Sequence, residues 1–426
     1  MMIFSLFVLL LTLLSLSVPI GIAIGVTTVL TLTIFSQIPT LMVAQNAFAG
    51  LDSFPLMAIP FFILAGNLMR YGGISRRLLD LADTLVGHLT GGLAMVTTLA
   101  CMFFGAISGS ANATVSAIGS FMIPEMRDKN YPEGYAAALT AAAGSIGVII
   151  PPSIPFVIYG VVTGTSIGAL FIAGIIPGIL MTFLLMLANY IICKKHGYRG
   201  KSEKASFKMI MHSLIDAIWA ILVPVIILGG IYGGVFTPTE AAVVAAVYAV
   251  IIGCFVYKEL DLKNLYASFR DTMLVNGAVT FILGLSVSFA HLVTMKQVPA
   301  LVGKYLINLD VSPFVILILI NIFLLIVGCF IDNISSCVIL APIFLPVVMA
   351  LGVDPIHFGI FLTINLSIGF VTPPYGSNLF IASAISGISV YKIYRFVWPL
   401  ILAMMIALVF VTYIPQLSMF LPGLFQ

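Results

Sequence analysis

The residues best suited to chemistry in this sequence are small and polar, and they interrupt apolar runs. In the first interruption, Ser108, Ser110 and Asn112 stand in the stretch GAISGSANAT, residues 105–114. Glycine permits a tight reversal, and Ser, Asn and Thr side chains can bond freed backbone groups. The stretch therefore predicts a re-entrant helical hairpin near 104–124. The alternative is a close helix–helix contact made by small residues.

The second interruption, GCFIDNISS at residues 328–336, predicts a matching hairpin near 328–350. It places Asp332, an ionisable residue, inside an apolar run, with Asn333 beside it. Ionisable residues at membrane depth are costly and are usually functional. The alternative for Asp332 is a structural carboxylate that accepts hydrogen bonds across the hairpin tip.

A double proline follows each predicted hairpin, at Pro151-Pro152 and at Pro373-Pro374. Proline has no N–H group and cannot bond the carbonyl four residues before it. The sequence thus predicts broken helices near 147–153 and 369–378. The carbonyls expected to be free are those of Gly147, Val148, Gly369 and Phe370. Unwound carbonyls coordinate sodium in transporters; the alternative is a simple kink filled by water or Ser.

These features repeat along the chain with an offset of 222 residues. The tripeptide Ser-Ile-Gly begins at Ser145 and again at Ser367, each time shortly before the double proline. The same offset relates Pro124 to Pro346, Pro177 to Pro399 and Ser110 to Asp332. Internal repeats of this kind are typical of secondary transporters. We expect the two copies to be inverted relative to each other.

The elements that must position these residues are membrane helices. Hydrophobic residues make up 61% of the 426 and charged residues only 8%, against about 25% in soluble domains. A helical span needs about 20 apolar residues, so the chain can form about a dozen. We therefore predict an all-α polytopic membrane protein with two re-entrant hairpins. The N-terminal run lacks a basic segment and is interpreted as a first span rather than a signal peptide.

One long polar linker, residues 194–208, divides the chain into halves at 1–193 and 209–426. It holds six basic residues, and Glu203 is its one acid. The positive-inside tendency predicts that this linker is cytoplasmic. A nucleic-acid patch is not expected, because strong spans flank the segment on both sides.

Together these segments resemble the large membrane subunit of tripartite ATP-independent periplasmic (TRAP) transporters. The matching stretches are AIPFFILAG at 58–66, ISGS at 107–110, IIPPS at 149–153, FTPTEAA at 236–242 and TPP at 372–374. The resemblance implies an elevator-type, sodium-coupled importer of organic acids such as C4-dicarboxylates or sialic acid, in the bacterial inner membrane. It also implies two partners, a small four-helix membrane subunit and a periplasmic substrate-binding protein. No cofactor other than the coupling ion is expected.

The site residues are predicted in three groups. One sodium site is expected at Ser108, Gly147, Ile150 and Pro152. Its repeat-related partner is expected at Gly328, Gly369, Thr372 and Tyr375. The solute is expected between the hairpin tips, near Ser110, Asn112, Asp332, Asn333 and Asn378.

Other functions fit the sequence less well. The chain has no HExxH motif, its five histidines are scattered, and no base accompanies Ser108 or Ser110, so an intramembrane enzyme is not expected. A channel would not require a sodium gradient. The remaining alternative is a stand-alone ion-coupled organic anion carrier of the same superfamily that needs no binding protein.

Overall fold

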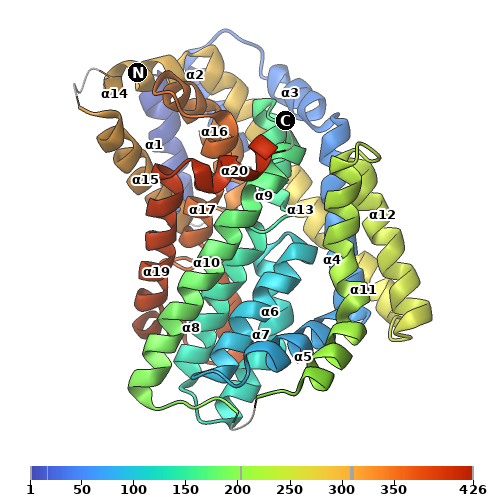
Figure 1. Cartoon of the computed structure of the whole chain (residues 1–426). Coiled ribbons are helices and arrows are strands. Elements are labelled where there is room, and N and C mark those ends of the chain that lie inside the picture. The colour runs from blue at the N-terminus through green and yellow to red at the C-terminus, as the bar shows by residue number, and fades with distance from the viewer. Residues whose placement is uncertain (1, 17, 202–203, 308–310, 425–426) are drawn as a thin grey trace.

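The computed structural model describes residues 2–16, 18–201, 204–307 and 311–424, and the regular structure within these ranges is helical throughout. Within these ranges, eight helices are long and apolar enough to cross a membrane, and seven shorter apolar helices accompany them (Figure 1). The predicted all-helical membrane fold is therefore confirmed.

The helices repeat with the offset predicted from the prolines. Adding 222 to residue 111, where α7 begins, gives 333, where α16 begins, and both helices have 18 residues. The other pairs agree to within a few residues at their starts. The pairs are α5 (Ile74–Val86) with α14 (Val298–Ile307), α6 (Gly92–Ser108) with α15 (Pro313–Phe330), α7 (Ala111–Asp128) with α16 (Asn333–Ala350), α8 (Glu133–Gly144) with α17 (Pro355–Gly369), α9 (Ile154–Thr163) with α18 (Ser377–Ser386), and α10 (Ile167–His196) with α19 (Val390–Tyr413).

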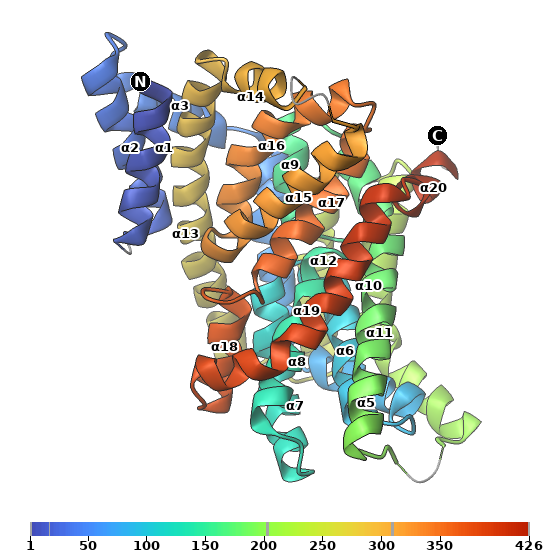
Figure 2. The same ribbon diagram turned by 90° about the vertical axis from the view of Figure 1, so that its left-hand side faces the viewer.

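The two copies occupy opposite ends of the bundle. Figure 2 shows α6, α7 and α8 in its lower half and α15, α16 and α17 in its upper half, and Figure 1 agrees. The helices that follow the double prolines are exchanged, with α9 in the upper half and α18 in the lower half (Figure 2). Each hairpin therefore points its tip toward the middle of the molecule.

The remaining helices lie around this pair of copies. The longest, α13 (Leu262–Met295), packs against α2, α3, α4 and α16. The others are α1 (Met2–Ser15), α2 (Ile20–Phe35), α3 (Leu41–Leu51), α4 (Ala58–Tyr71), α11 (Phe207–Tyr232), α12 (Pro238–Ile251) and α20 (Gln416–Leu424), with short 3-10 or π turns at Phe54–Met57, Ser145–Val148 and Ile252–Val256.

The predicted polar linker is short and partly docked. Helix α10 continues to His196, so Lys194 and Lys195 belong to its last turn. Beyond it, the Gly91 N–H donates to the Tyr198 carbonyl, and Lys201 forms an ion pair with Asp83 of α5. Ser202 and Glu203 lie outside the described residues.

Candidate functional site

The first hairpin tip is the turn between α6 and α7. Gly109 ends α6 with a φ of +61°, a conformation that favours glycine. Ser110 then caps α7, and its hydroxyl accepts from the Ala113 N–H at 3.4 Å. The Thr114 hydroxyl donates to the Ser110 carbonyl at 2.8 Å and lies 3.0 Å from the Ser108 hydroxyl. The tip is thus held by its own polar side chains.

This tip packs directly on the segment that leads to the first double proline. A Cβ on Gly105 would lie 2.7 Å from the Gly147 Cα, so two backbones touch where both residues are glycine. A Cβ on Gly147 would lie 2.4 Å from the Thr114 Oγ1. The Ile154 N–H, just beyond the prolines, donates to the Gly109 carbonyl at 3.2 Å. Ser108, Gly147 and Pro152, three of the four residues predicted for the first sodium site, therefore lie close together.

The carbonyls near the first double proline differ in their bonding. The Ser153 hydroxyl donates to the Val148 carbonyl at 2.6 Å and so replaces the missing backbone donor. The Gly147 carbonyl loses both usual helical donors, because Pro151 has no N–H and the Ile150 N–H donates to Ile146. Of the two carbonyls predicted to be free, only that of Gly147 lacks a local donor.

The second hairpin tip is built around Asp332. Its carboxylate accepts from the Ser335 N–H at 3.0 Å and from the Ser335 hydroxyl at 2.7 Å, and it thereby caps α16. A Cβ on Gly369 would lie 2.3 Å from the Gly328 carbonyl carbon and oxygen, so α15 and the end of α17 touch through backbone. The glycine-to-glycine contact of the first copy therefore recurs in the second.

The carbonyls before the second double proline are not free, which corrects the prediction. The Gly369 carbonyl accepts from the Thr372 N–H at 3.1 Å, and the Phe370 carbonyl accepts from the Asn378 N–H at 3.1 Å. The Thr372 N–H, just before the prolines, closes a tight local turn on Gly369. The Asn378 N–H reaches Phe370 because the chain turns back after the prolines. Each carbonyl oxygen still has a second lone pair for a ligand.

Tyr375 lies at the edge of the second predicted sodium site. Its side chain is 57% exposed and its ring lies 5.8 Å from the ring of Phe330. The Thr372 hydroxyl donates to the Ile368 carbonyl at 2.8 Å. Gly328, Gly369 and Thr372 therefore lie together, whereas much of the Tyr375 side chain is exposed beside them.

The two copies meet crosswise. Helix α7 packs on α18, the helix after the other copy's prolines, and α16 packs on α9 in the same way. The Asn378 amide donates to the Ala141 carbonyl and to the Ser145 hydroxyl, both at 3.0 Å. The Ser377 hydroxyl donates to the Asn112 side-chain oxygen at 3.3 Å. The first tip therefore faces the proline turn of the second copy, and the helix after the second tip packs on the helix after the first proline turn.

The predicted solute residues fall into two groups. Asn112 and Asn378 lie where the first tip meets the second proline turn. Asp332 and Asn333 belong to the second tip, and within the described ranges no hydrogen bond joins the two tips directly. Asn333 is only 3% exposed, and neither of its amide atoms has a partner in the described part of the chain. The Asn378 side-chain oxygen is likewise buried and unpaired.

Sequence reasoning missed several residues of this region. Thr114 bonds Ser108 and Ser110 in the first tip, and the Ser145 hydroxyl accepts from Asn378. The positions of Thr114 and Ser145 in the repeat could have indicated both residues. A buried chain of side chains, from Thr412 through Asn321 to Asn365, also crosses the second copy with bonds of 3.1 and 2.5 Å. No motif signals this chain, because its members lie on α19, α15 and α17.

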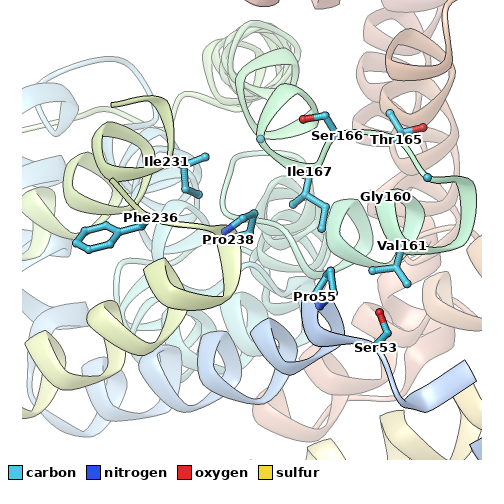
Figure 3. Close-up of a pocket in the computed structure, with 12 residues that line it drawn as sticks. Ser53, Pro55, Gly160, Val161, Thr165, Ser166, Ile167, Ile231, Phe236 and Pro238 are labelled. Carbon is cyan, nitrogen blue, oxygen red and sulfur yellow. The ribbon is translucent and has the colours of Figure 1, made fainter. Parts of the chain in front are cut away.

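A cavity of about 510 Å³ lies away from the tips. The connections that line it lie at the end of the bundle opposite the linker (Figure 1). Figure 3 shows side chains from three connections around it: Ser53 and Pro55, Val161 to Ile167, and Ile231 to Pro238. It therefore borders both the first copy and the surrounding helices.

Comparison with known proteins gives consistent matches over nearly the whole chain. The family model described as the DctM component of tripartite ATP-independent periplasmic transporters matches residues 7–417. The chain is 47% identical over 406 residues to the isethionate TRAP transporter permease protein DctMQ of Oleidesulfovibrio alaskensis, covering 95% of this chain and 64% of that protein. It is 42% identical over 401 residues to the C4-dicarboxylate TRAP transporter large permease protein DctM of Pseudomonas aeruginosa, covering 94% of each. It is 43% identical over 383 residues to the sialic acid TRAP transporter large permease protein SiaM of Vibrio cholerae, covering 90% and 89%.

A solved structure supports the fold. The Alcanivorax borkumensis YdaH transporter matches with a TM-score of 0.58 and 17% sequence identity, covering 88% of each chain. At that identity the likeness concerns the fold alone.

Proposed function

The chain belongs to the DctM family, the large membrane subunit of TRAP transporters, and from that premise we propose that it imports a small organic acid coupled to sodium. The named cargoes of the relatives are a sulfonate, C4-dicarboxylates and a sialic acid, which are all organic acids. The proposed cargo is a molecule of this class.

The observation that carries the proposal is the crossed arrangement of two tips and two proline turns. It combines buried unpaired amide groups, a carbonyl without local donors and two backbone contacts between glycines. Neutral oxygen atoms of this kind suit a hard monovalent cation, and broken helices at the interface between two repeats hold coupling ions in transporters.

Under this proposal, sodium binds in each copy beside the glycine contact. The first site takes the Gly147 carbonyl and the Ser108 hydroxyl, with Ile150 and Pro152 completing it through backbone oxygen atoms. The second takes backbone oxygen atoms of Gly328, Gly369 and Tyr375 together with Thr372. These ligands need no carboxylate, so the ion adds positive charge where an anionic solute has to bind.

The solute then lies against the crossing, beside Ser110, Asn112 and Asn378. Asn333 lies at the start of α16, where the positive end of the helix favours an anion. Asp332 holds this helix start in place through Ser335, and its negative charge either strengthens the field that holds sodium or binds a hydroxyl of the solute. Direct contact between Asp332 and a solute carboxylate would be repulsive.

The mobile part of the proposed elevator is the pair of copies with their tips, and the surrounding helices form the frame. Exposed apolar side chains on α11, such as Phe207, Ile215 and Val225, offer the frame a surface for the small membrane subunit or for lipid. The binding protein would meet the face opposite the linker, where the 510 Å³ cavity opens.

The test is uptake into proteoliposomes that contain this chain and its small subunit. A panel of organic acids is offered with and without matched binding proteins, in sodium or in potassium at equal membrane potential. We expect uptake only with sodium outside and with a binding protein present. Uptake without a binding protein would favour the stand-alone carrier, and uptake that is unaffected by sodium would refute the coupling.

A further inference from the structure

A small charged cavity lies between α8 and α19, away from the tips. It has a volume of about 280 Å³, and its lining includes Glu133, Lys392 and Arg395 with Tyr391 and Phe396. Figure 2 shows α19 starting in the lower half of the bundle, the half that also carries the basic linker. By the positive-inside tendency this is the cytoplasmic half.

The charges of this cavity lack partners. In the described part of the chain, no opposite charge lies within 4.0 Å of Glu133, Lys392 or Arg395, and none of their side chains makes a hydrogen bond. Two cations and one carboxylate therefore share one cavity without neutralising each other. A ligand that carries both signs could satisfy all three.

An apolar stripe leads out of the cavity along α19. Residues 391, 395, 398, 402, 405 and 409 recur every three or four positions and therefore share one helix face. Trp398, Leu402, Met405 and Val409 on that face are 39–59% exposed. Tyr391 is 81% exposed at the start of the helix. Tyr and Trp beside basic residues are typical of the membrane–water interface, and an apolar face beyond them suits acyl chains.

We propose that this cavity binds the headgroup of a phosphatidylethanolamine lipid. The Lys392 ammonium and the Arg395 guanidinium donate to its phosphate, and its primary ammonium donates to the Glu133 carboxylate. One acyl chain lies along the stripe from Trp398 to Val409. A purely anionic lipid fits less well, because it leaves Glu133 beside a phosphate without a counter-charge.

The test is native mass spectrometry of the purified full chain, titrated with lipids of identical acyl chains. Phosphatidylethanolamine, phosphatidylglycerol and phosphatidylcholine are compared. The wild type should bind phosphatidylethanolamine most tightly. The double variant Lys392→Gln/Arg395→Gln should bind it about 30-fold more weakly, since each basic residue near a lipid surface contributes about fivefold.

Two further variants separate this site from general charge attraction. Glu133→Gln should abolish the preference for phosphatidylethanolamine over phosphatidylglycerol while keeping phosphate binding. The control Lys208→Gln/Lys263→Gln removes two exposed cations elsewhere and should leave lipid binding unchanged. The site would be overturned if Glu133→Gln kept the wild-type lipid preference, or if the control lost as much lipid affinity as Lys392→Gln/Arg395→Gln. If soluble glycerophosphoethanolamine, which has no acyl chains, bound as tightly as phosphatidylethanolamine, the role of the stripe would be overturned.

Discussion

Replacing Gly147 by alanine should weaken the first hairpin tip, and the cost depends on Thr114. The new Cβ would lie 2.4 Å from the Thr114 Oγ1 and 3.0 Å from the Ser110 carbonyl oxygen. Thr114 has to move, and its hydrogen bonds to Ser110 at 2.8 Å and to Ser108 at 3.0 Å are then lost. Overpacking of this kind lowers the free energy of unfolding by about 1–3 kcal/mol.

A double-mutant cycle isolates this contact. Thr114→Ala alone removes the two hydrogen bonds and should cost about 1–2 kcal/mol. In Gly147→Ala/Thr114→Ala the clashing oxygen is absent, so the combined loss should be smaller than the two single losses added, by about 1 kcal/mol. Gly277→Ala on α13 is the matched control, because its Cβ meets nothing within 4 Å.

The assays are thermal unfolding in detergent and the sodium concentration that gives half-maximal uptake. If Gly147→Ala removes about 1.4 kcal/mol from the sodium-bound state, that concentration rises about tenfold. The double variant should recover part of this loss, whereas Gly277→Ala should match the wild type. Fully additive losses of stability would refute the packing argument. An unchanged sodium requirement in well-folded Gly147→Ala would refute its link to sodium.

Three other predictions follow from the same geometry. Asp332→Asn keeps an N-cap residue of similar quality, so it should unfold near the wild-type temperature yet transport poorly; Asp332→Ala should also lose about 0.5–2 kcal/mol of stability. Normal uptake by the Asn variant would exclude a need for the charge. Asn378→Ala should destabilise the chain by about 1–3 kcal/mol, because it breaks two buried bonds between the copies, whereas exposed Asn112→Ala should cost less than about 0.5 kcal/mol; equal unfolding temperatures would contradict this. A tag inserted after Lys204 should be inaccessible to impermeant reagents in intact cells, whereas a tag inserted at Gly234 should be accessible; the reverse labelling would overturn the topology. Gly200 is not a suitable insertion site, because a Cβ there would lie 2.1 Å from the Leu89 carbonyl oxygen.

Much of the fold could be predicted from the sequence because prolines and glycines mark backbone breaks directly. Pro124 and Pro346 lie inside α7 and α16, and their spacing gives the register in which the helices repeat. The tips were visible for the same reason, since small polar residues cannot form an ordinary apolar span. Local composition therefore indicates where each break occurs.

The partners of the freed groups could not be predicted in the same way. Ser153 bonds the Val148 carbonyl through a turn whose shape depends on packing. Asn378 bonds Ala141 and Ser145 across more than 230 residues of sequence. Such contacts arise from the crossing of the two copies, and no local pattern records which copy meets which turn.

The most direct test of the account is sodium binding to the purified chain, measured by calorimetry in a potassium background. The wild type should bind sodium and not potassium. Gly147→Ala and Gly369→Ala should each weaken one binding event, while Gly277→Ala should bind like the wild type. Absence of sodium-specific binding, or wild-type binding in both variants, would contradict the proposed sites.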